Sequence, residues 1–239
     1  MRLTTELLQA APSYLNPLND RELDLRGHKI PAIENLGVAG PQDAIDLTDN
    51  DIQALANFPL SERLKTLLLA RNRISTIQPT LASTLPNLTV LALAANNLSE
   101  LSDLDPLARF TRLTHLSLLD NPVTRKENYR YWVIWRCPSV RFLDYRKVKD
   151  VERVGAGRLF GSASEPSALA ARIMGIKSKT FDVSEPLNGG QKEYTVRLSA
   201  AERKSIEARI RAAKSLEEVA RLERELREGP QSSGDAMEE

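Results

Sequence analysis

Three stretches of this chain repeat one phrase: LKTLLLARNRI at residues 64–74, LTVLALAANNL at 88–98 and LTHLSLLDNPV at 113–123. Each stretch begins with leucine, has leucine again at its fourth and sixth positions, and carries asparagine at its ninth. An aliphatic residue closes each one at the eleventh position. Recurrence of one phrase at a nearly fixed period indicates a structural unit that is repeated and stacked along the chain.

Two weaker copies precede these three, DRELDLRGHKI at 20–30 and QDAIDLTDNDI at 42–52. His28 takes the asparagine position in the first copy, and we interpret it as a substitute for Asn because an imidazole also donates and accepts hydrogen bonds. The phrase is that of leucine-rich repeats, whose period is 20–29 residues. The sequence therefore predicts an α/β leucine-rich-repeat solenoid of about five repeats with a curved parallel sheet.

The ends of the repeat array need covers, because the first and last repeats leave apolar faces open. Residues 1–19 predict a short amphipathic helix with Leu3, Leu7, Leu8 and Ala11 on one side, limited in length by Pro12, which we interpret as the N-terminal cap. Aromatic and basic residues follow the last repeat, and they predict a helical C-terminal cap. We place this capped domain at residues 1–160.

The rest of the chain changes in composition. Glycine, proline and serine recur over 161–198, which predicts an extended linker with a short helix around 168–174. Ser199 and Glu202 have the spacing of a capping box, and an apolar stripe predicts a helical tail segment over 199–228. Residues 229–239 are small, polar and acidic, and we expect them to be disordered.

Composition and motifs exclude several classes of protein. The chain has 239 residues, a net charge of +1 and one cysteine, Cys137, so no internal disulfide is possible and a reducing compartment is favoured. No apolar run reaches the roughly 20 residues that span a membrane. Phosphate-binding glycine loops, nucleophile elbows and paired-cysteine metal sites are absent from the sequence. We expect no enzyme activity, no cofactor and no metal.

The residues between the inward leucines predict the binding surface, since side chains alternate along a strand. The first strand is charged, and the middle strands carry small or apolar residues that leave room for a partner helix. We predict that a partner protein binds Glu22, Asp24, Arg26, Asp46, Thr48, Thr66, Leu68, Ala70, Val90, Ala92, Ala94, His115, Ser117 and Leu119.

A basic cluster follows the last repeat, with eight Lys or Arg between Arg125 and Lys149. Aromatic residues, among them Phe142 and Tyr145, are interleaved with these charges, and most of them suit the core of the cap. We expect Phe142 to pack there. Phosphate contacts by such residues position an RNA without reading its sequence. The candidate RNA-binding residues are Arg26, Lys29, Arg146, Lys147 and Lys149.

Several stretches together resemble one family, the A-prime proteins of the U2 small nuclear ribonucleoprotein. They include RELDLRGHKIPAIENLG at 21–37, AIDLTDNDI at 44–52, RLKTLLLARNRI at 63–74 and NPVTRKENYRYWVI at 121–134. The tail stretches SKTF at 178–181 and SLEEVARLERELREG at 215–229 are also similar. The resemblance covers nearly the whole chain.

The resemblance implies a nuclear scaffold in pre-mRNA splicing. In this family the solenoid holds a helix of an RNA-recognition-motif partner, the B-double-prime protein, and the pair binds a stem-loop of U2 RNA. Other spliceosomal proteins are expected to contact the tail. The alternative is a regulatory leucine-rich-repeat subunit of a phosphatase or another enzyme, which would direct its substrate choice without RNA.

Overall fold

The computed structural model describes residues 2–162 and 164–176. The linker predicted for 161–198 is therefore described only in part. The helical tail segment predicted for 199–228 and the disorder predicted for 229–239 lie outside the described residues.

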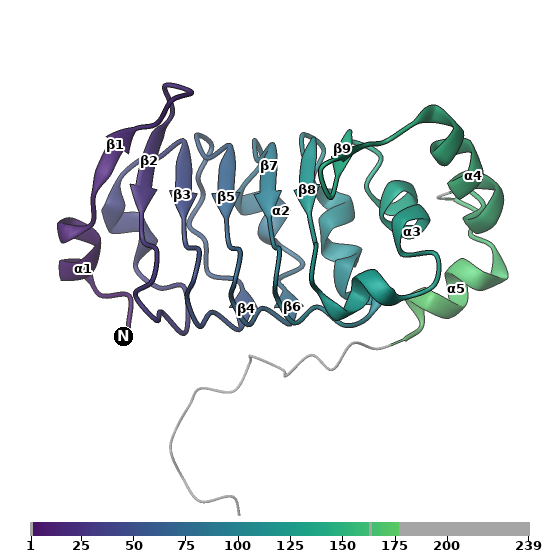
Figure 1. The fold of residues 1–239 in the computed structure, drawn as a ribbon, viewed down its shortest axis with the longest axis horizontal. Helices are drawn as coiled ribbons and strands as arrows, with labels where there is room; N and C mark the ends of the chain where they lie inside the picture. The colour runs from purple at the N-terminus through teal and green to yellow at the C-terminus, as the bar shows by residue number, and fades with distance from the viewer. Residues whose placement is uncertain (1, 163, 177–239) are drawn as a thin grey trace, which may run out of the picture. The chain divides into compact units, whose positions relative to one another are not determined.

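Eight strands form the main sheet of the repeat domain, one beside the next along the molecule (Figure 1). The central pairs are parallel, and each end of the sheet closes with an antiparallel pair. In order across the sheet, the strands are β1 (Ser13–Leu15), β2 (Arg21–Asp24), β3 (Ala44–Asp46), β5 (Thr66–Leu68), β7 (Val90–Ala92), β8 (His115–Ser117), β9 (Phe142–Leu143) and β10 (Arg146–Lys147).

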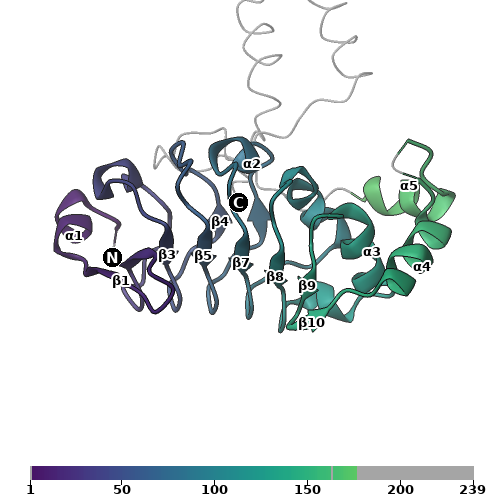
Figure 2. The same ribbon diagram turned by 90° about the horizontal axis from the view of Figure 1, so that it is seen from above.

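The strands follow an arc when viewed from above, and α2 lies on its outer side (Figure 2). This confirms the predicted curved parallel sheet. Short helices and a second, two-stranded sheet return the chain from one main strand to the next: η1 (Leu36–Ala39), β4 (Ala54–Leu55), β6 (Thr76–Ile77), α2 (Leu81–Thr84), η2 (Leu101–Arg109) and η3 (Pro122–Arg125). The phrase leucines fill the space between the two sides and are buried, so adjacent repeats share one core.

Buried asparagines at the ninth position of the phrase join successive repeats. The Asn72 Oδ1 accepts a hydrogen bond from the Ile52 backbone N–H at 3.1 Å, in the repeat before. Its Nδ2 donates to the carbonyl oxygens of Leu47 at 2.9 Å and Leu69 at 3.1 Å. Equivalent bonds are made by Asn50, Asn96 and Asn121. The ladder satisfies backbone groups where water cannot reach.

The first repeat departs from this ladder. His28 is half-buried at the asparagine position, and within residues 2–162 and 164–176 its imidazole makes no recorded hydrogen bond. The unit that stacks on the first repeat from the N-terminal side is the cap, not another repeat. An asparagine there would therefore lack the backbone partner that a preceding repeat provides.

The N-terminal cap begins with the short helix predicted before Pro12. Helix α1 (Thr5–Ala10) is capped by the Thr4 hydroxyl and packs Leu8 into the core. The chain then extends at Pro12 and forms β1, which pairs antiparallel with β2. Proline has no N–H, and its ring disfavours a helical conformation of the residue before it, Ala11, which is extended. The sheet edge then takes over the capping role.

The C-terminal cap contains helices α3 (Tyr129–Arg136), α4 (Asp150–Phe160) and α5 (Ala168–Met174). Trp132 and Phe160 are buried with their rings edge-to-face at 5.2 Å. The short helix predicted around 168–174 has the bounds of α5, but it packs on α4 and η2 and buries Ile173. The packed domain therefore continues past residue 160, because α5 contacts α4 and η2 and buries Ala170 and Ile173.

Candidate partner-binding surface

The open face of the main sheet presents three rows of side chains, defined by the strand register. One row runs Glu22, Ala44, Thr66, Val90, His115 and Phe142. The next row runs Asp24, Asp46, Leu68, Ala92 and Ser117. Arg26, Thr48, Ala70, Ala94 and Leu119 follow the strands in the third row. All fourteen residues that the sequence predicts for partner binding thus belong to these three rows, although Asp46 and Ser117 are themselves buried.

The N-terminal end of this surface is a paired polar network. The Arg26 guanidinium donates to both carboxylate oxygens of Asp24 and lies 3.6 Å from Asp46. Its hydrogen bonds hold the pKa of the Asp24 carboxyl below its usual value, and the carboxylates raise the pKa of Arg26. Glu22 accepts hydrogen bonds from the Tyr14 hydroxyl at 3.2 Å and the Asn16 amide at 3.0 Å. These hydrogen bonds and ion pairs therefore fix the charged side chains in position, and this end of the surface carries no net positive charge.

The other end of the surface is an apolar hollow, which we call the trough. It has a volume of about 330 Å³. The ring of Phe142 stacks on that of His115 with centroids 4.8 Å apart and forms its far wall. The Ser117 hydroxyl is buried there without a hydrogen-bond partner among the described residues. The lining residues are Leu68, Val90, Leu91, Ala92, His115, Leu116, Ser117, Phe142 and Tyr145.

Sequence reasoning missed Phe142 and Tyr145 as part of this surface. The sequence predicts Phe142 in the core of the C-terminal cap, yet the residue is 37% exposed and extends the row of His115. The missed signal is the spacing Val140-Arg141-Phe142-Leu143, which repeats the start of the phrase at 113–116. Leu143 continues the buried leucine row, so Phe142 must face the open side.

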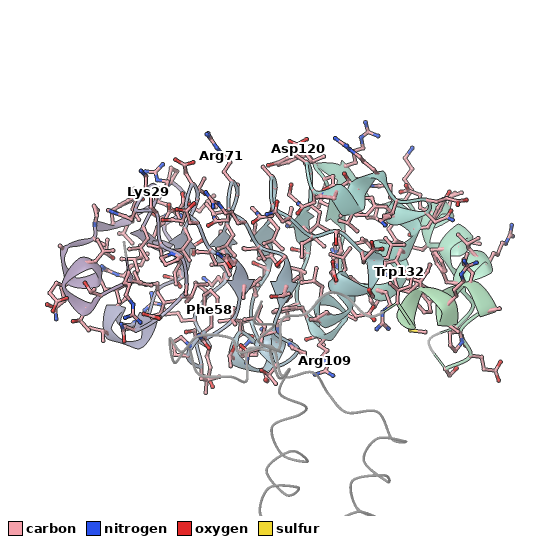
Figure 3. All side chains as sticks on the ribbon, turned by 90° about the horizontal axis from the view of Figure 1, so that it is seen from below. Lys29, Phe58, Arg71, Arg109, Asp120 and Trp132 are labelled. Atoms are coloured by element: carbon pink, nitrogen blue, oxygen red, sulfur yellow. The ribbon has the colours of Figure 1, made fainter. Side chains whose placement is uncertain are left out.

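The candidate RNA-binding residues lie at two ends of the sheet. Arg146 and Lys147 form β10, and Lys149 precedes α4, all three exposed. Lys29 follows β2 near the opposite end, and Figure 3 shows it well separated from Trp132 of the C-terminal cap. Arg26 has its guanidinium held by two carboxylates. The structure therefore brings together only the three C-terminal cations.

Several other cations of the basic cluster serve the fold of the cap. Arg130 binds Glu152 with Nε at 2.6 Å and donates to the carbonyl oxygens of Leu143 and Lys147. The Arg136 Nε donates to the Asp105 Oδ1 at 2.8 Å. A second hollow beside the trough, of about 510 Å³, is lined by Arg141, Phe142, Lys147, Val148, Asp150 and Arg153. Positive charge is thus retained next to the trough wall.

Comparison with known proteins identifies the lineage of this chain. A family model described as leucine-rich repeat matches residues 1–173. A protein from Aspergillus fumigatus named U2 small nuclear ribonucleoprotein A′ is 65% identical over 96% of this chain and 92% of that protein. The protein of the same name from Homo sapiens is 45% identical over 100% of this chain and 97% of that protein. The chain belongs to the U2 small nuclear ribonucleoprotein A′ family.

A solved structure supports the same membership. The Drosophila melanogaster SNF/U2A′ complex contains a chain that is 49% identical, with a TM-score of 0.66. The match covers 69% of this chain and 95% of that chain. The α/β leucine-rich-repeat fold is therefore confirmed by relatives and by structure, and the chain is a leucine-rich-repeat subunit of the U2 small nuclear ribonucleoprotein.

This member of the A′ family also has a buried thiol in its C-terminal cap. Cys137 is 1% exposed, and burial raises the pKa of its thiol to about 12. The described residues include no group of three or more His, Cys, Asp or Glu placed to hold a metal ion. None of the described helices has the length and apolar character needed to cross a membrane.

Proposed function

We propose that this A′ family member is a non-catalytic scaffold in pre-mRNA splicing. It holds a helix of an RNA-recognition-motif partner, the B-double-prime protein, on the open face of its sheet. It also assists the binding of a U2 RNA stem-loop through the cations beside the trough. The proposal places the protein in the nucleus.

The observation that carries this proposal is the trough. Leu68, Val90 and Ala92 leave an apolar surface that the repeat core does not need, and Phe142 bounds it at the C-terminal end. An amphipathic helix presents an apolar stripe of matching kind, and burial of that stripe favours binding. The solved Drosophila structure is a complex of U2A′ with SNF, which supports a protein partner for this family.

The charges around the trough add specificity to the proposed interface. Asp46 lies on β3 directly beside Leu68 of β5, and Asp24 lies one strand further away in the same row. Both carboxylates contact Arg26. A partner helix that lies along these rows would place polar groups there and apolar groups on Leu68 and Ala92. Complementary charges fix the register of such a contact more than they add to its affinity.

Charge insertion into the trough tests the partner site. In a titration of the full chain with the partner protein, we expect Leu68→Glu and Ala92→Glu each to abolish binding, because a buried unpaired carboxylate is strongly unfavourable. Leu60→Glu is the matched control. Leu60 is 67% exposed and lies in the loop after β4. It is two residues from Phe58, and Figure 3 shows Phe58 on the opposite side of the domain from Lys29 and Arg71.

Circular dichroism of each variant should retain the wild-type spectrum, since the two trough positions are not in the repeat core. Unchanged partner affinity in the folded Ala92→Glu variant would refute the trough as the binding site. Recovery of a phosphatase from nuclear extract without U2 RNA would instead support the regulatory-subunit alternative.

Salt dependence tests the RNA contacts. We expect the double substitution of Arg146 and Lys147 by Ala to weaken RNA binding by the complex and to reduce its dependence on salt. The slope of log K against log salt is negative, and each lost phosphate contact reduces its magnitude by roughly one. Alanine at both Arg158 and Arg172, on α4 and α5, removes the same charge away from β10 and is the control. Equal slopes for the two double variants would contradict a role of β10.

A further inference from the structure

The turn between β9 and β10 holds two consecutive residues in a conformation that L-amino acids rarely adopt. Asp144 has a φ of 52° and Tyr145 a φ of 60°. Two-residue turns of this kind are usually Asn-Gly or Asp-Gly, because glycine accepts positive φ without steric strain. Asp144 fits that preference. A tyrosine at the second position does not, and its strain requires a compensating contact.

Contacts within the chain account for Asp144. Its Oδ1 accepts the Leu118 backbone N–H at 2.7 Å, and its Oδ2 accepts the Tyr129 hydroxyl at 2.8 Å. The carboxylate therefore ties the turn to β8 and to α3. The strained backbone of Asp144 is offset by two hydrogen bonds that only this position can make.

Contacts within the chain do not account for Tyr145. Its side chain is 80% exposed, and no hydrogen bond of its hydroxyl is recorded among the described residues. The ring nevertheless borders the trough, beside the stacked pair of Phe142 and His115. The turn thus holds a large aromatic side chain at the mouth of an apolar hollow, where the chain itself offers it little to pack against.

We infer that Tyr145 is an anchor for the partner helix, positioned by the strained turn. This inference rests on the proposed function and adds a residue to it. The ring closes over an aliphatic side chain of the helix, which is then held between Tyr145 and the wall of Phe142. A tyrosine that is exposed in the free protein has most of its apolar area left to bury on binding. Aromatic residues that become buried at an interface are often the ones that dominate its affinity.

Tyr145→Gly separates this role from a structural one, because glycine relieves the turn and removes the ring together. We expect the dissociation constant of the partner complex to rise at least tenfold, while the urea midpoint of the free full chain stays equal or rises. Tyr145→Phe keeps the ring and should bind within threefold of wild type. Tyr131→Ala removes another exposed tyrosine, on α3 away from the trough, and should also bind within threefold.

Unchanged affinity in Tyr145→Gly would overturn the inference. So would a fall in its urea midpoint large enough to account for the weaker binding, since that result would assign the ring a structural role. The Ala92→Glu variant keeps the two proposals distinct. If Ala92→Glu binds normally, the proposed function fails. If Ala92→Glu abolishes binding and Tyr145→Gly does not weaken it, only the role of Tyr145 is refuted.

Discussion

Replacement of Asn72 by alanine should destabilise the repeat domain more than its small change in apolar area suggests. Asn72 is an interior member of the ladder, and its Oδ1 accepts the hydrogen bond of the Ile52 N–H. The carbonyl oxygens of Leu47 and Leu69 each keep a second donor, from Asn50 and Asn96 respectively. The substitution therefore orphans one buried donor and weakens the pairing of two acceptors.

The magnitude follows from these three groups. A buried donor left unpaired costs about 1–3 kcal/mol, and each lost hydrogen bond to a carbonyl that keeps another donor removes about 0.5–1.5 kcal/mol. We expect Asn72→Ala to lower the free energy of unfolding by about 4 kcal/mol. Asn97→Ala is the control, because this neighbouring side chain is exposed, and its effect should stay within about 0.5 kcal/mol.

Urea unfolding of the full chain, followed by circular dichroism, measures both variants. Amide hydrogen exchange gives a local check, since the Ile52 amide should exchange faster in Asn72→Ala than in Asn97→Ala. A loss below about 1 kcal/mol in a natively folded Asn72→Ala protein would refute the reasoning. It would mean that water or a shifted backbone satisfies the Ile52 N–H.

Three further predictions concern other parts of the domain. The pKa of Asp43 is held at about 2 by its hydrogen bonds to Arg63, so the stabilisation by its ionised form is present above about pH 4 and lost towards pH 2. The stability difference between wild type and Asp43→Asn in urea titrations should therefore shrink over that interval; a constant difference would contradict the pairing. Cys137 should react with an aromatic disulfide reagent at pH 8 only as fast as the protein unfolds, and rapid labelling of the native protein would show that the cap is open. Ala95 has a φ of 54°, so Ala95→Gly should leave the unfolding midpoint equal or higher, whereas the control Ala94→Gly should lower stability by about 0.5–1 kcal/mol.

Local patterns were sufficient for the repeat array. Leucines at the fourth and sixth positions of the phrase lie on one side of a strand by simple alternation, so the residues between them must face the other side. The same alternation puts Leu68 and Ala92 on the open face without knowledge of which strands pair. Asparagine at the ninth position indicates a side chain that hydrogen-bonds backbone groups as the chain leaves the strand, but only the structure shows that these bonds join successive repeats.

The ends of the array were less predictable, because their structure depends on contacts between distant segments. The sequence around Pro12 predicts the end of a helix but not that the following residues pair with β2. Helix α5 was expected, but its packing on α4 and η2 was not evident from composition. Phe142 was assigned to the core because aromatic residues in a cap usually lie there, and only its pairing beside His115 exposes it.

The sequence by itself determined the architecture, the side of the sheet on which each strand side chain lies and the positions of the repeated asparagines. These follow from residue spacings within a single repeat. Tertiary structure alone decided the chemistry at the two ends of the open face. It brought Arg26 to Asp46, 20 residues away, and so neutralised a cation that the sequence offers to RNA. It also set β9 beside β8 and thereby placed Tyr145 at the mouth of the trough, which no local pattern specifies.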